Sequence, residues 1–405
     1  MKFNIWTDCE SRPLPDILSF VVDNRGKTVP TAPHGRILIA TNCIRNENLY
    51  PSYEKIRYLT EDTYKTWFRA HPVPGDILFV CKGTPGRVCM VPEPIDFCIA
   101  QDMVALRANP AVIYNRYLLT VLRSDRIQSQ ITNTSVGDVI PHFKKSFFDQ
   151  ILVPIPDMKQ QNLIGDYYFA LSNRIENNKA INDNLEQQIA SVLAHTLTDR
   201  SCKNVKLGDY LYIKGRIGWK GLKKSEYLPL SQFRIINGES LTTNGIAWDK
   251  AGYISEERYK ESPEIMLQKG DILLSKDGTI GKIGYVDHLD CPTSVASGIF
   301  VIRNVKPAEI STHFIYYLLK SPLFEAFIAA RTEGSVIPHL YQKDFMEFEF
   351  SLPCSNVMME FDKITAPLFE LVFDNLRENS TLANLRDVLL PKLMSGELDV
   401  SEVSI

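Results

Sequence analysis

Lysine and arginine side chains set among glycines are the clearest candidates for chemistry in this sequence, because they can bind the phosphates of a nucleic acid. The densest group lies in residues 203–224, which contain several glycines, Trp219 and a single acid, Asp209. A glycine-rich basic loop can follow a phosphate backbone closely, although a solvated surface without a partner has the same composition. The candidates here are Lys214, Arg216, Lys220, Lys223 and Lys224.

A second set of candidates lies in a short turn that occurs twice. Residues 83–88 (Gly-Thr-Pro-Gly-Arg-Val) recur as residues 278–283 (Gly-Thr-Ile-Gly-Lys-Ile). Both turns could present cations and backbone N–H groups to phosphate, or both could be tight turns that a sheet requires. The candidates in the turns are Lys82, Thr84, Arg87, Lys276, Thr279 and Lys282. A smaller basic group near the start adds Arg25, Lys27 and Arg45.

Catalytic motifs are missing from the sequence. There is no G-x-x-x-x-G-K-[ST] phosphate loop, no [ND]-P-P-[YF] methyltransferase tetrapeptide, no H-E-x-x-H and no G-x-S-x-G. The glycines of residues 277–284 do not have nucleotide-loop spacing, and a strand-like segment follows them. His142 and His339 lack neighbouring metal ligands or carboxylates. The sequence therefore favours a binding protein without metal or cofactor over an enzyme.

Composition and charge place the chain among folded proteins of more than one domain. It has 405 residues, of which 44% are hydrophobic and 23% charged, and a formal net charge of −3. No apolar run reaches the roughly 20 residues that span a bilayer, and the first residues are too polar for a signal peptide. The eight cysteines never form a C-x-x-C pair. We therefore expect a reduced, cytoplasmic protein without a membrane segment.

The chain is a tandem duplication. Gly75-Asp76-Ile77-Leu78 recurs 195 residues later as Gly270-Asp271-Ile272-Leu273, at the same offset as the two turns. Val-Ile-Pro-His at residues 139–142 recurs at residues 336–339. This period is too long for a solenoid unit and nearly exhausts the chain, so it indicates a whole domain repeated head to tail.

Each copy begins with a mixed region of short strand-like and helical segments and ends in a long helix. Asp157, with Gln160 three residues later, predicts the start of the first helix. Apolar residues then recur in steps that average 3.5, which predicts a coiled-coil seam. The seam turns polar in the middle of both helices, either as a tolerated gap or because an antiparallel pair brings the polar centres together. Its predicted members are Leu171, Ile175, Asn178, Asn182, Leu185, Leu371, Asn375, Leu382 and Leu385.

We therefore predict an α+β fold with two mixed α/β globular domains, related by a pseudo-twofold axis and separated by two long antiparallel coiled-coil helices. The expected parts are a first domain at 1–156, a helix at 157–200, a second domain at 201–354, a helix at 355–398 and a tail at 399–405.

The duplicated order of motifs resembles the specificity subunit of type I DNA restriction–modification systems. The resemblance rests on Gly-Asp-Ile-Leu, the Gly-Thr-x-Gly-Lys/Arg turn, the Val-Ile-Pro stretch and the proline-flanked strand before each long helix, and it spans essentially the whole chain. The terminal stretch 385–398 is also typical of these subunits.

The resemblance implies a non-catalytic reader of double-stranded DNA, in which each target recognition domain reads one half of a split, asymmetric site. The helices would set the spacing and dock two modification subunits, which use S-adenosylmethionine. Restriction subunits, which use ATP and Mg²⁺, would join through the complex. The alternatives are a self-contained methyltransferase or nuclease with a cryptic site, and a scaffold whose two domains bind proteins. Base-reading residues are not assigned.

Overall fold

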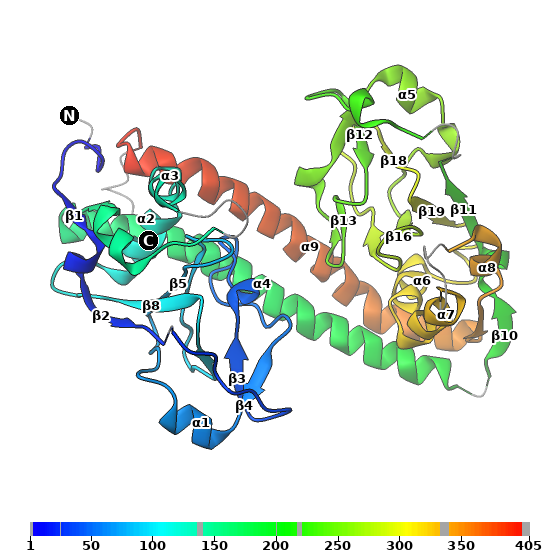
Figure 1. The fold of residues 1–405 in the computed structure, drawn as a ribbon. Coiled ribbons are helices and arrows are strands. Elements are labelled where there is room, and N and C mark those ends of the chain that lie inside the picture. Colours follow the sequence, from blue (N-terminus) through cyan, green and yellow to red (C-terminus); the bar gives the residue numbers. More distant parts are fainter. Residues whose placement is uncertain are drawn as a thin grey trace. The chain divides into compact units, whose positions relative to one another are not determined.

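The computed structural model describes residues 3–24, 26–135, 141–199, 201–216, 221–332 and 340–398. The chain forms two compact units, and each contains half of both long helices. The first unit comprises 1–180 and 376–405, and the second comprises 181–375. We call the globular part of each unit, outside the long helices, the first domain and the second domain (Figure 1).

The first domain places a four-stranded sheet between helices and a smaller sheet. The four-stranded antiparallel sheet has the order β2 (Leu18–Val22), β8 (Met103–Ala108), β5 (Ile77–Val80), β6 (Val88–Met90). The mixed three-stranded sheet has the order β4 (Arg57–Leu59), β3 (Arg36–Ile39), β7 (Phe97–Ile99). The remaining elements are β1 (Ser11–Pro13) paired with β9 (Leu152–Pro154), and helices α1 (Glu61–Thr66), α2 (Asn115–Arg123) and α3 (Asp125–Thr134).

The side chains of β5 point alternately to the two faces of the four-stranded sheet, and this explains why both faces are covered. Ile77 and Phe79 pack into the cluster that contains the buried face of α2, whereas Leu78 and Val80 pack against residues of β3 and β7. Successive side chains of a strand point to opposite faces, so the continuous apolar run of β5 belongs to a strand that is covered on both sides. The Gly-Asp-Ile-Leu motif therefore starts the central strand of the core.

The second domain repeats this plan with the same strand order. Its four-stranded antiparallel sheet is β11 (Leu211–Gly215), β19 (Ile299–Asn304), β16 (Ile272–Ser275), β17 (Ile283–Tyr285). Its mixed sheet is β15 (Gly252–Ile254), β12 (Phe233–Ile236), β18 (Thr293–Val295). The other elements are β10 (Lys203–Lys206) paired with β20 (Glu349–Leu352), and helices α5 (Glu256–Lys260), α6 (Thr312–Leu319), α7 (Pro322–Thr332) and α8 (Gln342–Met346). The predicted duplication is thus confirmed strand by strand in both sheets.

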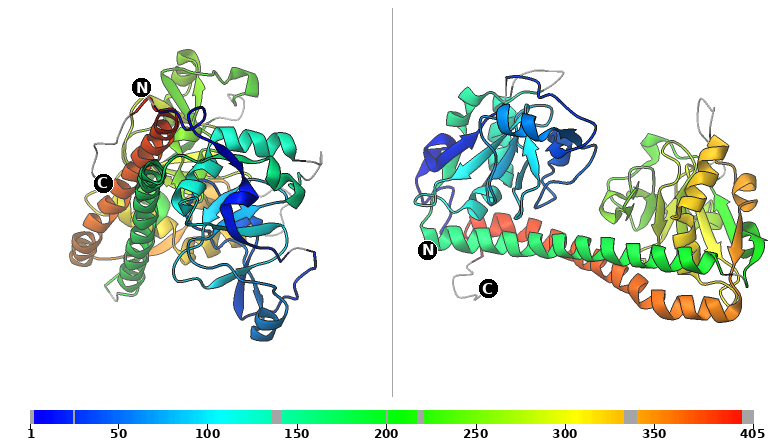
Figure 2. Two further views of the ribbon diagram at one scale, coloured as in Figure 1. Left: turned by 90° about the vertical axis from the view of Figure 1, so that its left-hand side faces the viewer. Right: turned by 90° about the horizontal axis from the view of Figure 1, so that it is seen from below.

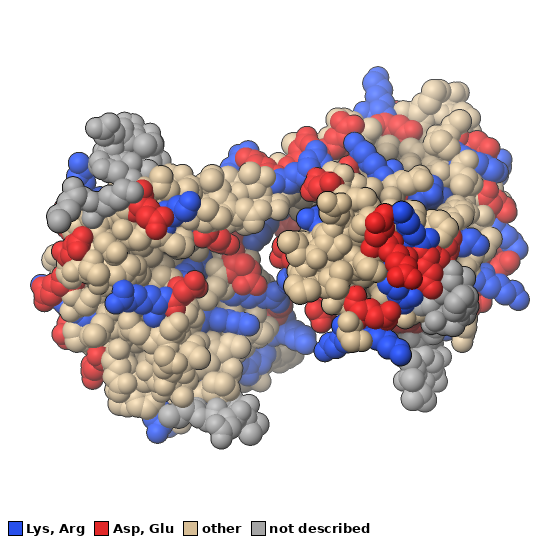
Figure 3. Space-filling model, turned by 90° about the horizontal axis from the view of Figure 1, so that it is seen from above, with Lys and Arg blue, Asp and Glu red and all other residues tan. Residues whose placement is uncertain are grey.

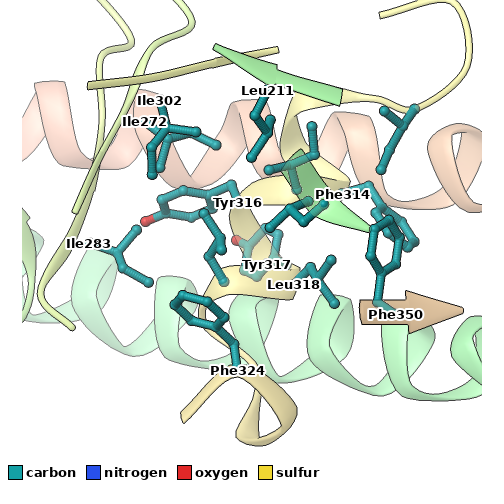
Figure 4. Close-up of a cluster of buried hydrophobic side chains, with 14 of the residues drawn as sticks. Leu211, Ile272, Ile283, Ile302, Phe314, Tyr316, Tyr317, Leu318, Phe324 and Phe350 are labelled. Atoms are coloured by element: carbon teal, nitrogen blue, oxygen red, sulfur yellow. The ribbon is translucent and has the colours of Figure 1, made fainter. Parts of the chain in front are cut away.

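One pair of strands in the second domain has no counterpart among the described residues of the first. It is a hairpin formed by β13 (Leu241–Thr242) and β14 (Gly245–Ile246) between β12 and β15. The second domain also carries a large aromatic core, in which Phe314, Tyr316 and Tyr317 of α6 lie among aliphatic side chains of the sheet (Figure 4).

Two helices of 40 residues each complete the fold, α4 (Met158–Leu197) and α9 (Ser355–Met394), and each is about 60 Å long. The carboxylate of Asp157 accepts a hydrogen bond from the Gln160 N–H at 2.9 Å, as the predicted cap requires. Gly396, with φ +72°, ends α9 in the left-handed conformation that favours glycine. Just before it, the Met394 carbonyl accepts the Ile5 N–H at 3.0 Å. None of the described helices is long and apolar enough to cross a membrane.

The two helices pair antiparallel within each unit (Figures 1 and 2). In the first unit, the Arg386 guanidinium lies 5.5 Å from the Tyr168 ring centre and Asn178 Nδ2 donates to Asn379 Oδ1 at 2.9 Å. In the second unit, Asn375 Nδ2 donates to Asn182 Oδ1 at 2.8 Å. Residue numbers therefore rise along one helix as they fall along the other. The two amide pairs are copies of each other at the repeat offset of 197, so the predicted meeting of polar residues is confirmed within each unit.

The seam of α4 lies close to the predicted positions, and that of α9 is shifted. Ile175, Asn178, Asn182 and Leu185 are buried and Leu171 is half-buried. On α9, Asn375 is buried and Leu382 half-buried, but Leu371 and Leu385 are 43% and 42% exposed.

This exposure corrects the assignment of Leu371 and Leu385 to the seam. The positions one residue later, Val372 and Arg386, are buried in their place. For Leu371 the cause is the second domain, because Phe369 and Phe373 turn toward Tyr285 at ring-centre distances of 4.9 and 5.0 Å. For Leu385, in the first unit, the residue that packs inward is Arg386, over the Tyr168 ring of α4. The face of α9 that packs inward is therefore set by the domain as well as by α4.

Candidate nucleic-acid interface

The duplicated turn joins two neighbouring strands in each domain, β5 to β6 and β16 to β17. In the first, the Gly86 N–H donates to the Val80 carbonyl at 3.0 Å, and in the second the Gly281 N–H donates to the Ser275 carbonyl at 3.1 Å. Both glycines have a φ of +90°, a conformation that residues with a Cβ adopt at a cost. The turn is therefore structural, and its cations stand on a fixed backbone.

The polar side chains of the two turns differ in exposure. In the first domain, Lys82, Thr84 and Arg87 are all exposed. In the second, Thr279 is the exposed member of the three candidates, and the acidic Asp277 is exposed beside it. Lys276 lies over the Phe300 ring at 5.1 Å, and Lys282 Nζ donates to the Gly238 carbonyl at 3.0 Å. The first turn thus offers two unshielded cations to a phosphate, and the second uses its lysines partly for packing.

An ion pair between a buried aspartate and a partly exposed arginine supports each turn from the other end of the strand. Asp76 is 1% exposed and accepts two hydrogen bonds from Arg107, at 2.9 and 3.0 Å. Asp271 is fully buried and accepts the same pair from Arg303, at 2.6 and 2.7 Å. In both pairs these hydrogen bonds raise the pKa of the arginine. Sequence reasoning missed both arginines, although their offset of 196 marks them as a repeated pair.

The basic stretch of the second domain is divided among several environments. Lys214 on β11 is exposed and lies 5.9 Å from the Tyr212 ring centre. Lys223 and Lys224 are exposed and begin a short 3-10 turn, in which Glu226 accepts the Lys223 backbone N–H at 2.7 Å. Lys220 lies outside the described residues. The described cations that can reach a phosphate are therefore Lys214, Lys223 and Lys224.

Arg216 is a correction to the predicted interface. It is 2% exposed, and its guanidinium donates to the Val295 carbonyl at 3.2 Å and lies 3.5 Å from the hydroxyl oxygens of Ser262 and Ser294. Burial lowers the pKa of Arg216, since its charged form loses solvation. Its role is to join strands inside the second domain, because a side chain in this position does not reach a phosphate.

The basic group near the start of the chain is only partly available. Lys27 is exposed, whereas Arg45 is held by the Glu54 carboxylate at 2.6 and 2.9 Å. Arg25 lies outside the described residues. On the face in Figure 3, positive and negative side chains are interspersed over both units, with no single large basic area. The candidate contacts are therefore small local groups, as the net charge of −3 suggests.

The described side chains form no group of three or more histidines, cysteines and carboxylates that could hold a metal ion. A comparison with protein-family models finds the type I restriction modification DNA specificity domain twice, at residues 14–187 and 202–365. The chain belongs to this family. The two matches correspond to the two copies of the repeat, each with the first part of the long helix that follows it.

Relatives and solved structures agree with this family. The MjaIX specificity subunit of Methanocaldococcus jannaschii is 22% identical over 349 residues, which cover 81% of this chain and 79% of the relative. The MjaVIII specificity subunit of the same organism is 20% identical over 355 residues, or 81% of this chain and 80% of the relative. A type I system S subunit from M. genitalium superposes with a TM-score of 0.58 at 19% identity, and the match covers 97% of this chain and 98% of that subunit.

These findings confirm the predicted family and fold class. The protein is a specificity subunit of a type I restriction–modification system, whose role is DNA recognition. It has two mixed α/β domains and two long paired helices.

Proposed function

We propose that each target recognition domain of this specificity subunit reads one half of a split, asymmetric DNA site. The observation that carries the proposal is the duplication of a complete domain. Each copy has its own sheets, its own Asp–Arg ion pair and its own turn with cations. Because the two domains share a fold but differ in their surface residues, they can recognise two different half-sites.

Phosphate contacts come from the exposed cations, and base contacts supply the sequence preference. In the first domain the cations are Lys27, Lys82 and Arg87, with Thr84 as a neutral donor. In the second they are Lys214, Lys223 and Lys224, with Thr279 as the donor and the partly shielded Lys276 and Lys282 beside it. The chain itself carries no catalytic site and binds no cofactor. It acts in the cytoplasm, and S-adenosylmethionine, ATP and Mg²⁺ belong to its partner subunits.

The long helices dock the modification subunits, of which we propose two, and the restriction subunits join through the complex. Support comes from apolar side chains that α9 leaves exposed at heptad spacing, Ile364, Leu371 and Leu385 at 45%, 43% and 42%. The heptad position between Leu371 and Leu385 is Glu378, which pairs with Arg174 of α4, so each unit has its own exposed apolar side chains. Exposed apolar patches mark interaction surfaces. These exposed side chains are the ones that the shifted seam leaves without a partner in this chain.

The decisive experiment is methylome sequencing of cells that contain the modification subunits, with and without this chain. We expect a two-part methylated motif that depends on this chain. A motif that persists without it, or the absence of any motif, would overturn the proposal. Purified chain with S-adenosylmethionine alone should leave DNA unmethylated, whereas methylation by the chain alone would establish the competing self-contained enzyme.

The helices also act as the ruler between the half-sites. Seven residues inserted after Ala180 and seven after Asn375 lengthen both helices at the limits of the compact units and preserve the heptad phase. The added length of about 10.5 Å corresponds to roughly three base pairs of DNA. Methylation of a library of sites with graded spacers should then prefer a longer gap with unchanged half-sites. An unchanged preferred gap would show that the helices do not measure it.

A further inference from the structure

The β13–β14 hairpin is the pair of strands that distinguishes the second domain from the described part of the first. Between β3 and β4 the first domain has residues 40–56, which contain a 3-10 turn and no strand. Between β12 and β15 the second domain has residues 237–251, which contain the hairpin. If two copies of one framework read different half-sites, they must differ where they touch bases. The hairpin is therefore the first place to search.

The hairpin is seated firmly on the four-stranded sheet. Leu241 is fully buried, and a Cβ added to Gly284 of β17 would lie 2.9 Å from Leu241 Cδ1 and 2.6 Å from Ile246 Cγ1. Glycine at position 284 thus makes room for the hairpin. The matching residue of the first domain, at the offset of 195, is the buried Cys89. The difference between the domains therefore extends below the surface.

The base and the turn of the hairpin are fixed by hydrogen bonds. Lys282 of the duplicated turn donates to the Gly238 carbonyl at 3.0 Å, which ties the hairpin to that turn. The Thr242 hydroxyl donates to the Gly245 carbonyl at 2.9 Å and accepts the Asn244 N–H at 3.1 Å. Gly245 has a φ of +97°, the left-handed position of a tight hairpin turn. The tip is therefore held in one conformation.

The tip presents two polar side chains to solvent, Thr243 and Asn244. In the described part of the chain neither side chain has a hydrogen-bond partner within the protein. Lys250, exposed just after the hairpin, can meet a phosphate, while the Glu239 carboxylate stays near the base. A two-stranded ribbon fits the major groove, and an asparagine carboxamide can form two hydrogen bonds with adenine N6 and N7.

We propose that this hairpin enters the major groove of the second half-site and that Asn244 reads an adenine there, with Thr243 beside it. The proposal rests on the function proposed above and names a specificity-determining residue for it. The fixed tip lowers the entropy lost on binding. The two hydrogen bonds need both the donor and the acceptor of the carboxamide, so an aspartate of the same shape cannot replace it.

The test uses the complete complex with its modification subunits and compares Asn244→Ala, Asn244→Asp and the unaltered protein. We expect the methylated motif to lose selectivity at one adenine of the second half-site, by on the order of ten- to a hundredfold. The first half-site should stay unchanged. Gln232→Ala, at another exposed position of the same domain, is the matched control and should leave the motif intact.

Competition binding with oligonucleotides changed at each position separates the outcomes. Affinity that falls equally for all sequences, or a motif that stays unchanged in both Asn244 variants, overturns the reading role of the hairpin. An unaltered complex that yields no two-part motif overturns the proposed function instead. Thermal unfolding of the variants should match that of the unaltered protein, because the Asn244 side chain is exposed and makes no hydrogen bond in the described structure.

Discussion

The helix that fastens each domain to the long helices occupies the same place in the repeat but uses different side chains. In the first domain, Arg116 of α2 contacts Asp166 of α4 at 2.7 Å and lies 3.7 Å from the Phe169 ring centre. In the second, the residue 197 positions later is His313 of α6. Its ring lies 3.1 Å from Asp362 and stacks on Phe361 at 5.6 Å.

The contacts around these two residues extend the difference. Arg123 of α2 donates to the Tyr168 hydroxyl at 2.9 Å, and the Tyr114 hydroxyl donates to Asp166 at 2.7 Å. Around α6, Tyr316 meets Phe369 and Phe373 at ring-centre distances of 5.7 and 6.0 Å. The two copies thus keep the same fold but attach to the long helices differently. The first domain attaches mainly through hydrogen bonds and an ion pair, and the second mainly through packing of aromatic rings. The two attachments should fail under different conditions.

The largest effect is expected from Phe369→Ala in the aromatic attachment. Phe369 is 7% exposed and touches Tyr285, Tyr316 and Phe373. Truncating a buried phenylalanine typically costs about 3–5 kcal/mol of unfolding free energy. Denaturant unfolding followed by hydrogen exchange should place the loss in the second unit.

Met359→Ala on the same helix is the control, since Met359 is 62% exposed and its loss should cost less than about 0.5 kcal/mol. Equal losses for the two variants would show that the aromatic cluster does not hold the second domain.

A smaller effect is expected from Arg116→Ala in the polar attachment. The variant loses a half-exposed ion pair and a close cation–π contact, together about 1–2 kcal/mol. Hydrogen exchange in residues 158–180 should increase, and the difference from the unaltered protein should shrink at high salt, because the ion pair is screened.

Arg116→Lys sharpens the comparison, because lysine keeps the charge but lacks the planar group that stacks on Phe169. Full stability in this variant would assign the attachment to charge alone and contradict the contribution of stacking.

The smallest effect is expected when the pH is lowered and His313 of the aromatic attachment becomes protonated. Burial lowers the pKa of His313 below its ordinary value, against the opposing effects of Asp362 and Glu370. The neutral ring is thus favoured in the folded state, and its stabilisation is fully present above the unfolded pKa of about 6.5. It is lost as the pH falls from there toward the lower folded pKa.

Hydrogen exchange near α6 at pH 7.5 and 5.5 should show this loosening, and His313→Gln should weaken its pH dependence. The separate measurement at α6 matters, because burial also lowers the pKa of His71 in the first domain. An unchanged pH response in the variant would remove His313 as the cause.

The sequence predicted the fold far better than the surfaces. The offset shared by the Gly-Asp-Ile-Leu motif and the turns was sufficient to establish the duplication, because one local pattern repeated in order implies one fold repeated. The position of Arg216 was not predictable in the same way, since its burial depends on Ser262, Ser294 and Val295 from distant parts of the chain.

The seam of α9 shows the same limit. Leu371 and Leu385 satisfy the 3.5-residue period, but that period alone does not identify the face that a neighbouring domain covers. The hairpin was missed because its strands have two residues each, too few for a pattern of alternation to appear. Local periodicity predicted the helices and strands. Contacts between residues distant in the sequence decided which of their side chains stayed exposed to solvent.

The hydrogen bond from Ile5 to Met394 has a consequence for synthesis on the ribosome. The second unit is one continuous stretch, 181–375, whereas the first unit needs residues 376–398 to cover its opening segment. Domains form as their residues emerge, so the second unit can close while the first still lacks its half of α9. The part of the protein that is translated first is therefore completed last, and a truncated chain that ends near residue 375 would contain all of the second unit beside a first unit that lacks its half of α9.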